Sequence, residues 1–213
     1  MTYTDLIWDF NGTLYDDVQA CLDSIDTLLV RYGKPPLGTK ERYREVFGFP
    51  IEEYYRRAGF DFDEEPFEKL AHEWVELYFA NSTHSGLYPG ARETLDAFRS
   101  MGYRHTLLSA TELGMLGGQV GALGIAGYFE EILGLGDIYA HSKTELGRMW
   151  KKRHPDRRPL FIGDTVHDAE TADAMGADCV LISAGHQSGQ VLLATGKPVL
   201  DSIRELVPFV GAT

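Results

Sequence analysis

The chain has 213 residues, of which 44% are hydrophobic, and it carries a formal net charge of −12. This length and hydrophobic content suffice for a substantial core, in one domain or in one domain with an insertion. The negative charge and the lack of lysine- and arginine-rich runs disfavour nucleic acid and anionic membrane surfaces as partners. The sequence shows no signal peptide and no stretch of roughly 20 apolar residues, so we expect a cytoplasmic protein with no membrane helix.

The first predicted element is a buried strand at residues 6–8, which ends at the carboxylate of Asp9. The dipeptide Asn11-Gly12 is also typical of a two-residue β-hairpin, in which Asp9 would only be a turn residue. However, residues 13–15 are short for a return strand, and apolar residues then recur at helical spacing over 18–32. The pattern therefore favours strand, loop and helix, with Asp9 where open α/β sheets bind their ligands.

Residues 16 to about 85 are predicted to be almost entirely helical, and no second strand is predicted before Tyr103. The helical segments are expected at 16–32, 39–46, 50–58 and 66–80. We therefore expect an inserted helical module at residues 16–85 and a core domain formed by residues 1–15 and 86–213. The turn Phe47-Gly48-Phe49-Pro50 has the composition of a specificity loop at the mouth of this module, and Arg42 and Arg44 lie near it.

Strands and helices alternate from Pro89 onward. Strands are predicted at 103–109, near 132–133, at 159–163, at 178–182 and near 199, and helices at 90–101, 111–123, 143–153, 167–175 and 202–208. This alternation predicts an α/β fold with a parallel, doubly wound sheet that is covered on both faces.

Polar groups follow the predicted strands or begin the predicted helices at four places. These are Asp9, Ser109-Ala110, Lys143, and the pair Asp164 and Asp168. Because the strands of a parallel sheet end at one edge, residues far apart in the sequence can meet there. Asp164 and Asp168 could simply complement a helix dipole. Together with Asp9, however, they form an oxygen-rich set suited to Mg²⁺.

Ser109 and Lys143 each have a structural and a functional interpretation. Ser109 and Glu112 have the spacing of a capping box, and a capped helix N-terminus can also bind a phosphoryl oxygen. Lys143 is predicted in the first turn of a helix, where a cation opposes the macrodipole. A surface lysine tolerates that position at little cost, whereas the functional interpretation pairs Lys143 with Asp9 and a phosphate.

In their order and spacing, these residues resemble the four motifs of the haloacid dehalogenase (HAD) superfamily. The motifs are Asp9-Phe10-Asn11-Gly12-Thr13, Leu107-Leu108-Ser109-Ala110, Lys143, and Phe161-Ile162-Gly163-Asp164-Thr165-Val166-His167-Asp168. The run from Phe161 through Gly185-His186-Gln187-Ser188 is most similar to the phosphoglycolate phosphatase-like branch. The resemblance covers essentially the whole chain and implies a Rossmann-like HAD core with an α-helical cap at residues 16–85.

The resemblance also implies the hydrolysis of a small phosphorylated metabolite through an aspartyl-phosphate on Asp9. The cofactor would be Mg²⁺, held by Asp9, the backbone carbonyl of Asn11, Asp164 and Asp168. The phosphoryl group would be bound by Thr13, Ser109, Ala110 and Lys143. The catalytic residues would be Asp9, Asn11 and Lys143.

Asn11 departs from the family pattern, because phosphatases of this superfamily usually have an aspartate two residues after the nucleophile. That acid protonates the leaving oxygen and then activates water, whereas an amide can only orient water. General acid-base catalysis is typically worth 10² to 10⁴ in rate, or about 3 to 5 kcal/mol. The loss is partial when the leaving group is already a good anion, as in an acyl phosphate. Asp16, Asp17 and His167 are candidates to replace the acid by proximity in sequence alone.

Two alternative functions stay open. The first is a C–halogen hydrolase, which in this superfamily tolerates a non-acidic residue at the position of Asn11 and needs no metal. The pair Asp164 and Asp168 argues against it. The second is a catalytically impaired phosphate-binding regulatory protein, in which Asn11 has removed turnover. The sequence specifies neither the physiological substrate nor the oligomeric state.

Overall fold

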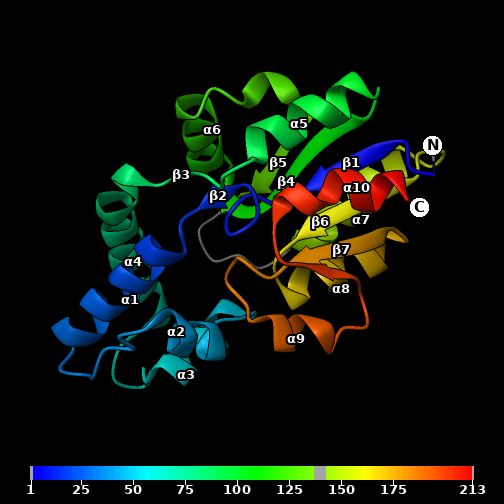
Figure 1. The fold of residues 1–213 in the computed structure, drawn as a ribbon. Helices are drawn as coiled ribbons and strands as arrows, with labels where there is room; N and C mark the ends of the chain where they lie inside the picture. The colour runs from blue at the N-terminus through cyan, green and yellow to red at the C-terminus, as the bar shows by residue number, and fades with distance from the viewer. Residues whose placement is uncertain (1, 137–142, 213) are drawn as a thin grey trace.

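The computed structural model describes residues 2–136 and 143–212, and its centre is a six-stranded parallel sheet (Figure 1). The strand order is β5-β4-β1-β6-β7-β8, with every neighbouring pair parallel. The strands are β1 (Asp5–Trp8), β4 (Arg104–Glu112), β5 (Glu131–Leu135), β6 (Pro159–Gly163), β7 (Asp178–Ile182) and β8 (Val199–Leu200). The predicted doubly wound α/β fold is confirmed.

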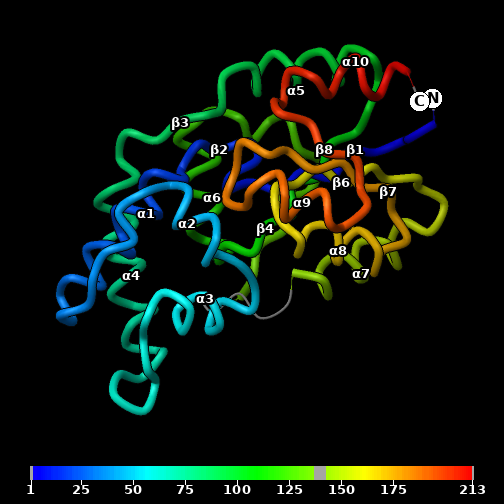
Figure 2. The backbone as a smooth tube through the Cα atoms, turned by 60° about the horizontal axis from the view of Figure 1, so that its bottom comes forward, coloured from blue at the N-terminus to red at the C-terminus, as the bar shows by residue number. Residues whose placement is uncertain are grey.

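Helices cover both faces of this sheet, as Figure 2 shows for α5 and α10 on one side and α7 and α8 on the other. The helices of this region are α5 (Ala91–Ser100), α6 (Leu113–Ala122), α7 (Lys143–Arg153), α8 (Val166–Met175), α9 (Gly189–Leu193) and α10 (Leu206–Gly211). In β1, Leu6 and Trp8 join the core cluster that includes Phe98 of α5, whereas Ile7 joins the cluster of Trp150 in α7. Because successive side chains alternate in direction, a strand buried on both faces is apolar throughout.

Four helices, α1 (Val18–Arg31), α2 (Lys40–Val46), α3 (Ile51–Ala58) and α4 (Phe67–Asn81), lie together at one end of the sheet (Figure 1). Their bounds agree closely with the predicted helical segments. The expectation of no further strand before Tyr103 is wrong, because β2 (Tyr15–Asp16) pairs antiparallel with β3 (Gly86–Leu87). Strands of two residues are too short to show an alternating pattern. We propose that this ribbon separates the helical module at 16–85 from the core at 1–15 and 86–213.

The start of α6 differs from the prediction. Strand β4 continues to Glu112, with an irregular register after Leu108, and α6 begins at Leu113. The N-cap residue of α6 is Glu112, whose carboxylate accepts hydrogen bonds from the backbone N–H of Gly114 at 2.8 Å and of Met115 at 2.9 Å. The predicted capping box with Ser109 is therefore wrong, since Ser109 lies within the strand that precedes the cap.

The C-terminal segment contains one helix that the sequence did not predict. Helix α9 begins after Ser188, whose hydroxyl accepts a hydrogen bond from the backbone N–H of Val191. The helix expected at 202–208 is a 3₁₀ turn, η3 (Ile203–Glu205), followed by α10. Two further 3₁₀ turns are η1 (Ser82–His84) and η2 (Ala126–Tyr128). Elements of three to six residues are too short to show a recognisable helical periodicity.

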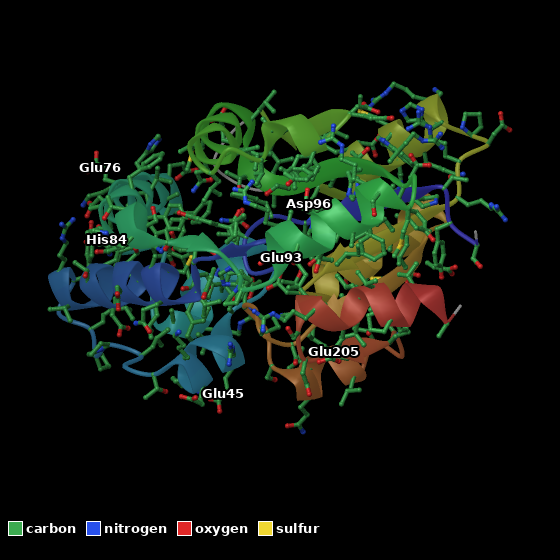
Figure 3. All side chains as sticks on the ribbon, turned by 45° about the horizontal axis from the view of Figure 1, so that its top comes forward. Glu45, Glu76, His84, Glu93, Asp96 and Glu205 are labelled. Atoms are coloured by element: carbon green, nitrogen blue, oxygen red, sulfur yellow. The ribbon has the colours of Figure 1, made fainter. Side chains whose placement is uncertain are left out.

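The acidic side chains labelled in Figure 3 are exposed and come from several elements. They are Glu45 on α2, Glu76 on α4, Glu93 and Asp96 on α5, and Glu205 on η3. The excess negative charge is thus distributed over both the helical module and the core. In the described residues, no helix combines the length and the apolar character needed to cross a membrane.

Candidate active site

Asp9, Lys143 and Asp168 meet at the carboxyl edge of the sheet. Asp9 follows β1, Lys143 is the first residue of α7, and Asp168 lies in the first turn of α8. The Lys143 ammonium group donates hydrogen bonds to Oδ1 of Asp9 and, at 2.5 Å, to Oδ1 of Asp168. All three side chains are buried. A cation that is unfavourable for the helix dipole is therefore held between two carboxylates.

Asp168 serves both the helix and the site. Its Oδ2 atom accepts hydrogen bonds from the backbone N–H of Asp164 at 3.0 Å and from the backbone N–H and hydroxyl of Thr165 at 2.9 and 2.7 Å. With Thr165 it forms a capping box at the start of α8. Burial alone would raise the pKa of Asp168, but Lys143 and these hydrogen bonds hold that pKa below its ordinary value. The carboxylate is thus fixed and ionised.

Asp164 is fully buried at the end of β6. Its carboxylate accepts hydrogen bonds from the hydroxyl of Thr13 at 2.9 Å and from the backbone N–H of His186 at 2.6 Å. Glycines make this packing feasible, because a Cβ atom at Gly12 or Gly185 would lie 2.3 or 2.2 Å from Oδ2 of Asp164. Gly12 also has φ +76°, which favours glycine.

The side chain of Thr13 is directed to Asp164. Its hydroxyl donates to Asp164 and its backbone N–H donates to the carbonyl of Phe10 at 3.3 Å. The residue is fully buried and does not line the cavity described below. In this structure Thr13 positions Asp164, and its predicted contact with a phosphoryl group stays a prediction.

Three carboxylates are crowded at this edge of the sheet. Oxygens of Asp9, Asp164 and Asp168 all lie within 4.8 Å of one another. Burial, and then the neighbouring carboxylates, raise the pKa of Asp9 despite the opposing effect of Lys143, and burial raises the pKa of Asp164 to about 6. One lysine compensates only part of this negative charge. A cluster of hard oxygen donors with excess negative charge fits a divalent cation such as Mg²⁺.

The side chain of Asn11 is held by hydrogen bonds at both ends. Its amide nitrogen donates to Oδ2 of Asp17 at 2.7 Å and to the hydroxyl of Tyr78 at 3.0 Å. Its amide oxygen accepts a hydrogen bond from the hydroxyl of Thr111 at 2.7 Å. Asn11 therefore connects helix α4 of the module with the end of β4.

Asp16, Asp17 and His167 were the candidates to replace the missing acid, and of these Asp17 contacts Asn11. Asp16 is exposed, and His167 stacks on Phe49. Asp17 is fully buried, accepts hydrogen bonds from Tyr78 and from the backbone N–H of Gly12, and forms an ion pair with Nε2 of His186 at 3.3 Å. Burial alone would raise its pKa, but His186 and the hydrogen bonds lower it.

His186 completes this network on the side of the core. Burial alone would lower its pKa, but the charge of Asp17 raises it to about 9, so the ring is cationic at neutral pH. Its Nδ1 atom is 2.8 Å from the hydroxyl of Tyr43 on α2. The sequence placed His186 in a family-like run but gave it no role, because its partner Asp17 is 169 positions away in the chain.

A cavity of about 160 Å³ opens between the acidic site and the helical module. At one end it is lined by Asp9, Lys143 and Asp168, together with Ser109 and Ala110 at the end of β4. Ser109 is buried, and its hydroxyl donates to that of Thr111 at 3.1 Å. The structure thus brings together the sequence-predicted residues Asp9, Ser109, Ala110, Lys143 and Asp168.

The other end of the cavity is lined by aromatic residues of the module. Phe47 and Phe49, from the turn predicted as a specificity loop, lie there with Tyr54, Trp74 and Tyr78. The sequence did not identify Trp74 and Tyr78, because their i,i+4 spacing on α4 is also that of ordinary core residues.

The two arginines near this turn do not line the cavity. Arg44 donates hydrogen bonds to the backbone carbonyls of Gly185 and Ala184, at 2.8 and 2.7 Å. Arg42 pairs with Glu45 on the same helix. Arg44 therefore ties the module to the core.

The parallel sheet and its helical insertion define a Rossmann-like α/β protein, and the carboxylate cluster at the strand ends could hold a metal ion. The model of the haloacid dehalogenase-like hydrolase family matches residues 6–182, and the chain belongs to this family. The phosphoglycolate phosphatase of Pseudomonas putida is 28% identical over 95% of this chain and 78% of its own length. That of Nitrosococcus oceani is 29% identical over 94% of this chain and 93% of its own length.

Solved structures have the same fold. A haloacid dehalogenase-like family protein, SP0104 from Streptococcus pneumoniae, superposes with a TM-score of 0.84 at 19% identity, covering 98% of this chain and 99% of its own. A predicted phosphoglycolate phosphatase from Haemophilus somnus superposes with a TM-score of 0.80 at 20% identity, covering 99% of both chains. At these identities the likeness concerns the fold.

Proposed function

We propose that this protein is a Mg²⁺-dependent phosphatase that hydrolyses a small phosphorylated metabolite through an aspartyl-phosphate on Asp9. The observation that carries the proposal is the cluster of Asp9, Asp164 and Asp168, whose oxygens lie within 4.8 Å of one another beside the buried Lys143. Relatives named phosphoglycolate phosphatase, at 28–29% identity over nearly the whole chain, support it.

In the first step, a carboxylate oxygen of Asp9 attacks phosphorus and the bond from phosphorus to the leaving oxygen breaks. Lys143 binds a phosphoryl oxygen with the N–H that does not contact Asp9 or Asp168, and Ser109 and Ala110 enclose the group at the end of β4. Asp9, Asp164, Asp168 and the backbone carbonyl of Asn11 would hold Mg²⁺, which would neutralise the charge of the phosphoryl group.

In the second step, water attacks phosphorus and releases Asp9 and inorganic phosphate. Asn11 cannot take the proton of this water, and its amide is directed to Asp17 and Tyr78. Asp17 is surrounded by donors and paired with His186, so its carboxylate is not available as a replacement acid. Turnover therefore depends on phosphoryl transfer that needs little proton transfer from the enzyme.

The test is release of inorganic phosphate from a panel of phosphate esters and acetyl phosphate, with Mg²⁺ and with EDTA. We expect turnover only with Mg²⁺, loss of turnover in Asp9→Asn, and inhibition by beryllofluoride. Calorimetry should give a Mg²⁺ affinity that falls at least about tenfold in Asp164→Ala. Activity that survives Asp9→Asn, or the absence of turnover on every compound, contradicts the proposal.

The two alternatives predict different results in the same experiment. A C–halogen hydrolase needs no metal and releases halide from a 2-haloacid in EDTA. A phosphate-binding regulatory protein binds Mg²⁺ and beryllofluoride, yet releases no phosphate even at enzyme concentrations equal to those of the substrate.

A further inference from the structure

The part of the cavity that faces away from the acidic site is apolar. Its lining from the helical module includes Phe47, Phe49, Ile51, Tyr54, Trp74 and Val75. Trp74 stacks on Tyr78, with ring centroids 5.1 Å apart and an angle of 12° between the planes. Flat apolar walls of this kind bind a ring through area burial and stacking.

In the part of the chain that the structure describes, this apolar end has no cation for an anionic leaving group. Among the cavity-lining residues of the described chain, the cationic groups are Lys143 and His186, and both are paired with carboxylates. A carboxylate such as that of phosphoglycolate would therefore be buried against aromatic rings without a counter-charge, which is unfavourable.

Two residues that line the cavity have buried polar hydrogens without a partner in the described structure. They are the hydroxyl of Tyr54 and the indole N–H of Trp74. Buried donors are usually satisfied, so each such donor requires an explanation. An acceptor on the rim of a bound ring would supply the missing partner.

The leaving oxygen must also depart without a proton from the enzyme. Asn11 replaces the acid, and Asp17 is enclosed by Asn11, Gly12, Tyr78 and His186. A phenol-type hydroxyl has a pKa of about 10, against about 15.7 for water, so its anion leaves far more readily. The apolar lining and the missing acid therefore select the same kind of leaving group.

On these grounds, and resting on the phosphatase function proposed above, we propose that the substrate is a phosphate ester of a hydroxyl group on an uncharged aromatic ring. The whole cavity, its phosphoryl end included, measures about 160 Å³, close to the ~150 Å³ of an engineered cavity that binds benzene, so it has room for no more than one ring. The substrate class is thus a single-ring aryl phosphate.

The reaction balances without an enzyme acid. Asp9 forms a bond to phosphorus while the bond between phosphorus and the aryl oxygen breaks, and the electron pair of that bond leaves with the aryl oxygen. Water then attacks phosphorus, the bond to Asp9 breaks, and hydrogen phosphate forms with release of one proton. That proton neutralises the aryl oxide in solvent.

The experiment measures kcat/KM of the full chain with Mg²⁺ on phenyl phosphate, benzyl phosphate, 2-phosphoglycolate and acetyl phosphate. We expect phenyl phosphate to exceed benzyl phosphate and 2-phosphoglycolate by at least about 100-fold, the lower range of general acid catalysis. A faster reaction of 2-phosphoglycolate or benzyl phosphate overturns the inference but leaves the phosphatase function intact. If none of the four compounds is hydrolysed, the phosphatase function itself fails.

Variants of the cavity separate binding of the ring from the intrinsic reactivity of phenyl phosphate. Acetyl phosphate has a good leaving group and no ring, so the ratio of phenyl to acetyl phosphate isolates the contribution of the ring. Trp74→Leu should lower this ratio about tenfold. Phe49→Leu is the second variant in case Trp74→Leu does not fold. Phe79→Leu, at an exposed position of α4, is the matched control. A ratio that neither Trp74→Leu nor Phe49→Leu lowers overturns the inference.

Discussion

Replacing Asn11 by aspartate restores the usual family residue, and the structure predicts that this change destabilises the protein. The amide nitrogen of Asn11 donates to the fully buried carboxylate of Asp17 at 2.7 Å. An ionised aspartate in its place would face a second carboxylate at hydrogen-bond distance. Two such groups cannot both stay charged, so one takes up a proton and donates it to the other.

The cost follows from the protonation of one carboxyl group. An ordinary aspartate has a pKa of about 3.9, so holding it neutral costs about 4 kcal/mol at pH 7 and about 1.5 kcal/mol at pH 5. The acid in the folded Asn11→Asp variant has a raised pKa. The destabilisation is therefore absent below the unfolded pKa and grows as the pH rises. Without Mg²⁺, the free energy of unfolding of Asn11→Asp should fall below that of the unmodified chain by these amounts.

The assay is urea unfolding in EDTA at pH 5 and pH 7, with Asn11→Ala as the control. The control loses the same hydrogen bond but introduces no charge, so its loss of stability should depend little on pH. In the double variant Asn11→Asp with Asp17→Asn, the amide at position 17 donates to the carboxylate at position 11. This variant should recover at least about 2 kcal/mol of the lost free energy of unfolding at pH 7. An Asn11→Asp variant as stable at pH 7 as at pH 5, or a double variant without recovery, refutes the reasoning.

Further predictions concern acid stability, the lysine and a glycine. Burial lowers the pKa of His105 to about 4, so the neutral ring favours the folded state. This contribution to the free energy of unfolding should be fully present above pH 6.5, and about 2 kcal/mol of it should be lost at pH 5. In His105→Leu, urea unfolding at the two pH values should show no such loss. Lys143→Met should abolish turnover and lower stability by about 3 to 5 kcal/mol in EDTA, and less in Mg²⁺, as calorimetric melting can measure. Gly185→Ala should displace Asp164 and weaken Mg²⁺ binding at least about tenfold by calorimetry, whereas Gly189→Ala, with its nearest contact at 3.5 Å, should not.

Much of the fold could be predicted because the central strands are apolar on both faces. Residues 6–8, 159–163 and 178–182 are such runs, and all are strands of the sheet. The start of α6 was predicted less accurately, because the local sequence there suits two structures. The spacing of Ser109 and Glu112 suits a capping box, but β4 continues through Ser109 because its pairing with β5 extends to Glu112. Pairing between distant strands is not visible in a window of a few residues.

The site was predictable to the extent that it lies at strand ends. Asp9, Lys143 and Asp168 meet because the topology of a parallel sheet brings those ends together. The roles of Thr13 and Trp74 were not predictable, because each depends on packing. The Thr13 hydroxyl donates to Asp164, a contact that depends on the packing of two buried side chains from distant parts of the chain.

Asn11 and Asp17 are best understood as one unit. Taken alone, Asn11 is a missing acid, and Asp17 is an acid near enough in sequence to replace it. In the structure the amide of Asn11 helps to keep the buried Asp17 ionised, and Asp17 in turn balances the charge of His186. An aspartate at position 11 therefore requires a neutral residue at position 17. In the double variant Asn11→Asp with Asp17→Asn, a general acid becomes available, so the advantage of phenyl over benzyl phosphate should shrink by at least about tenfold. If the double variant is folded and that advantage is unchanged, the lack of an acid at position 11 does not select the leaving group.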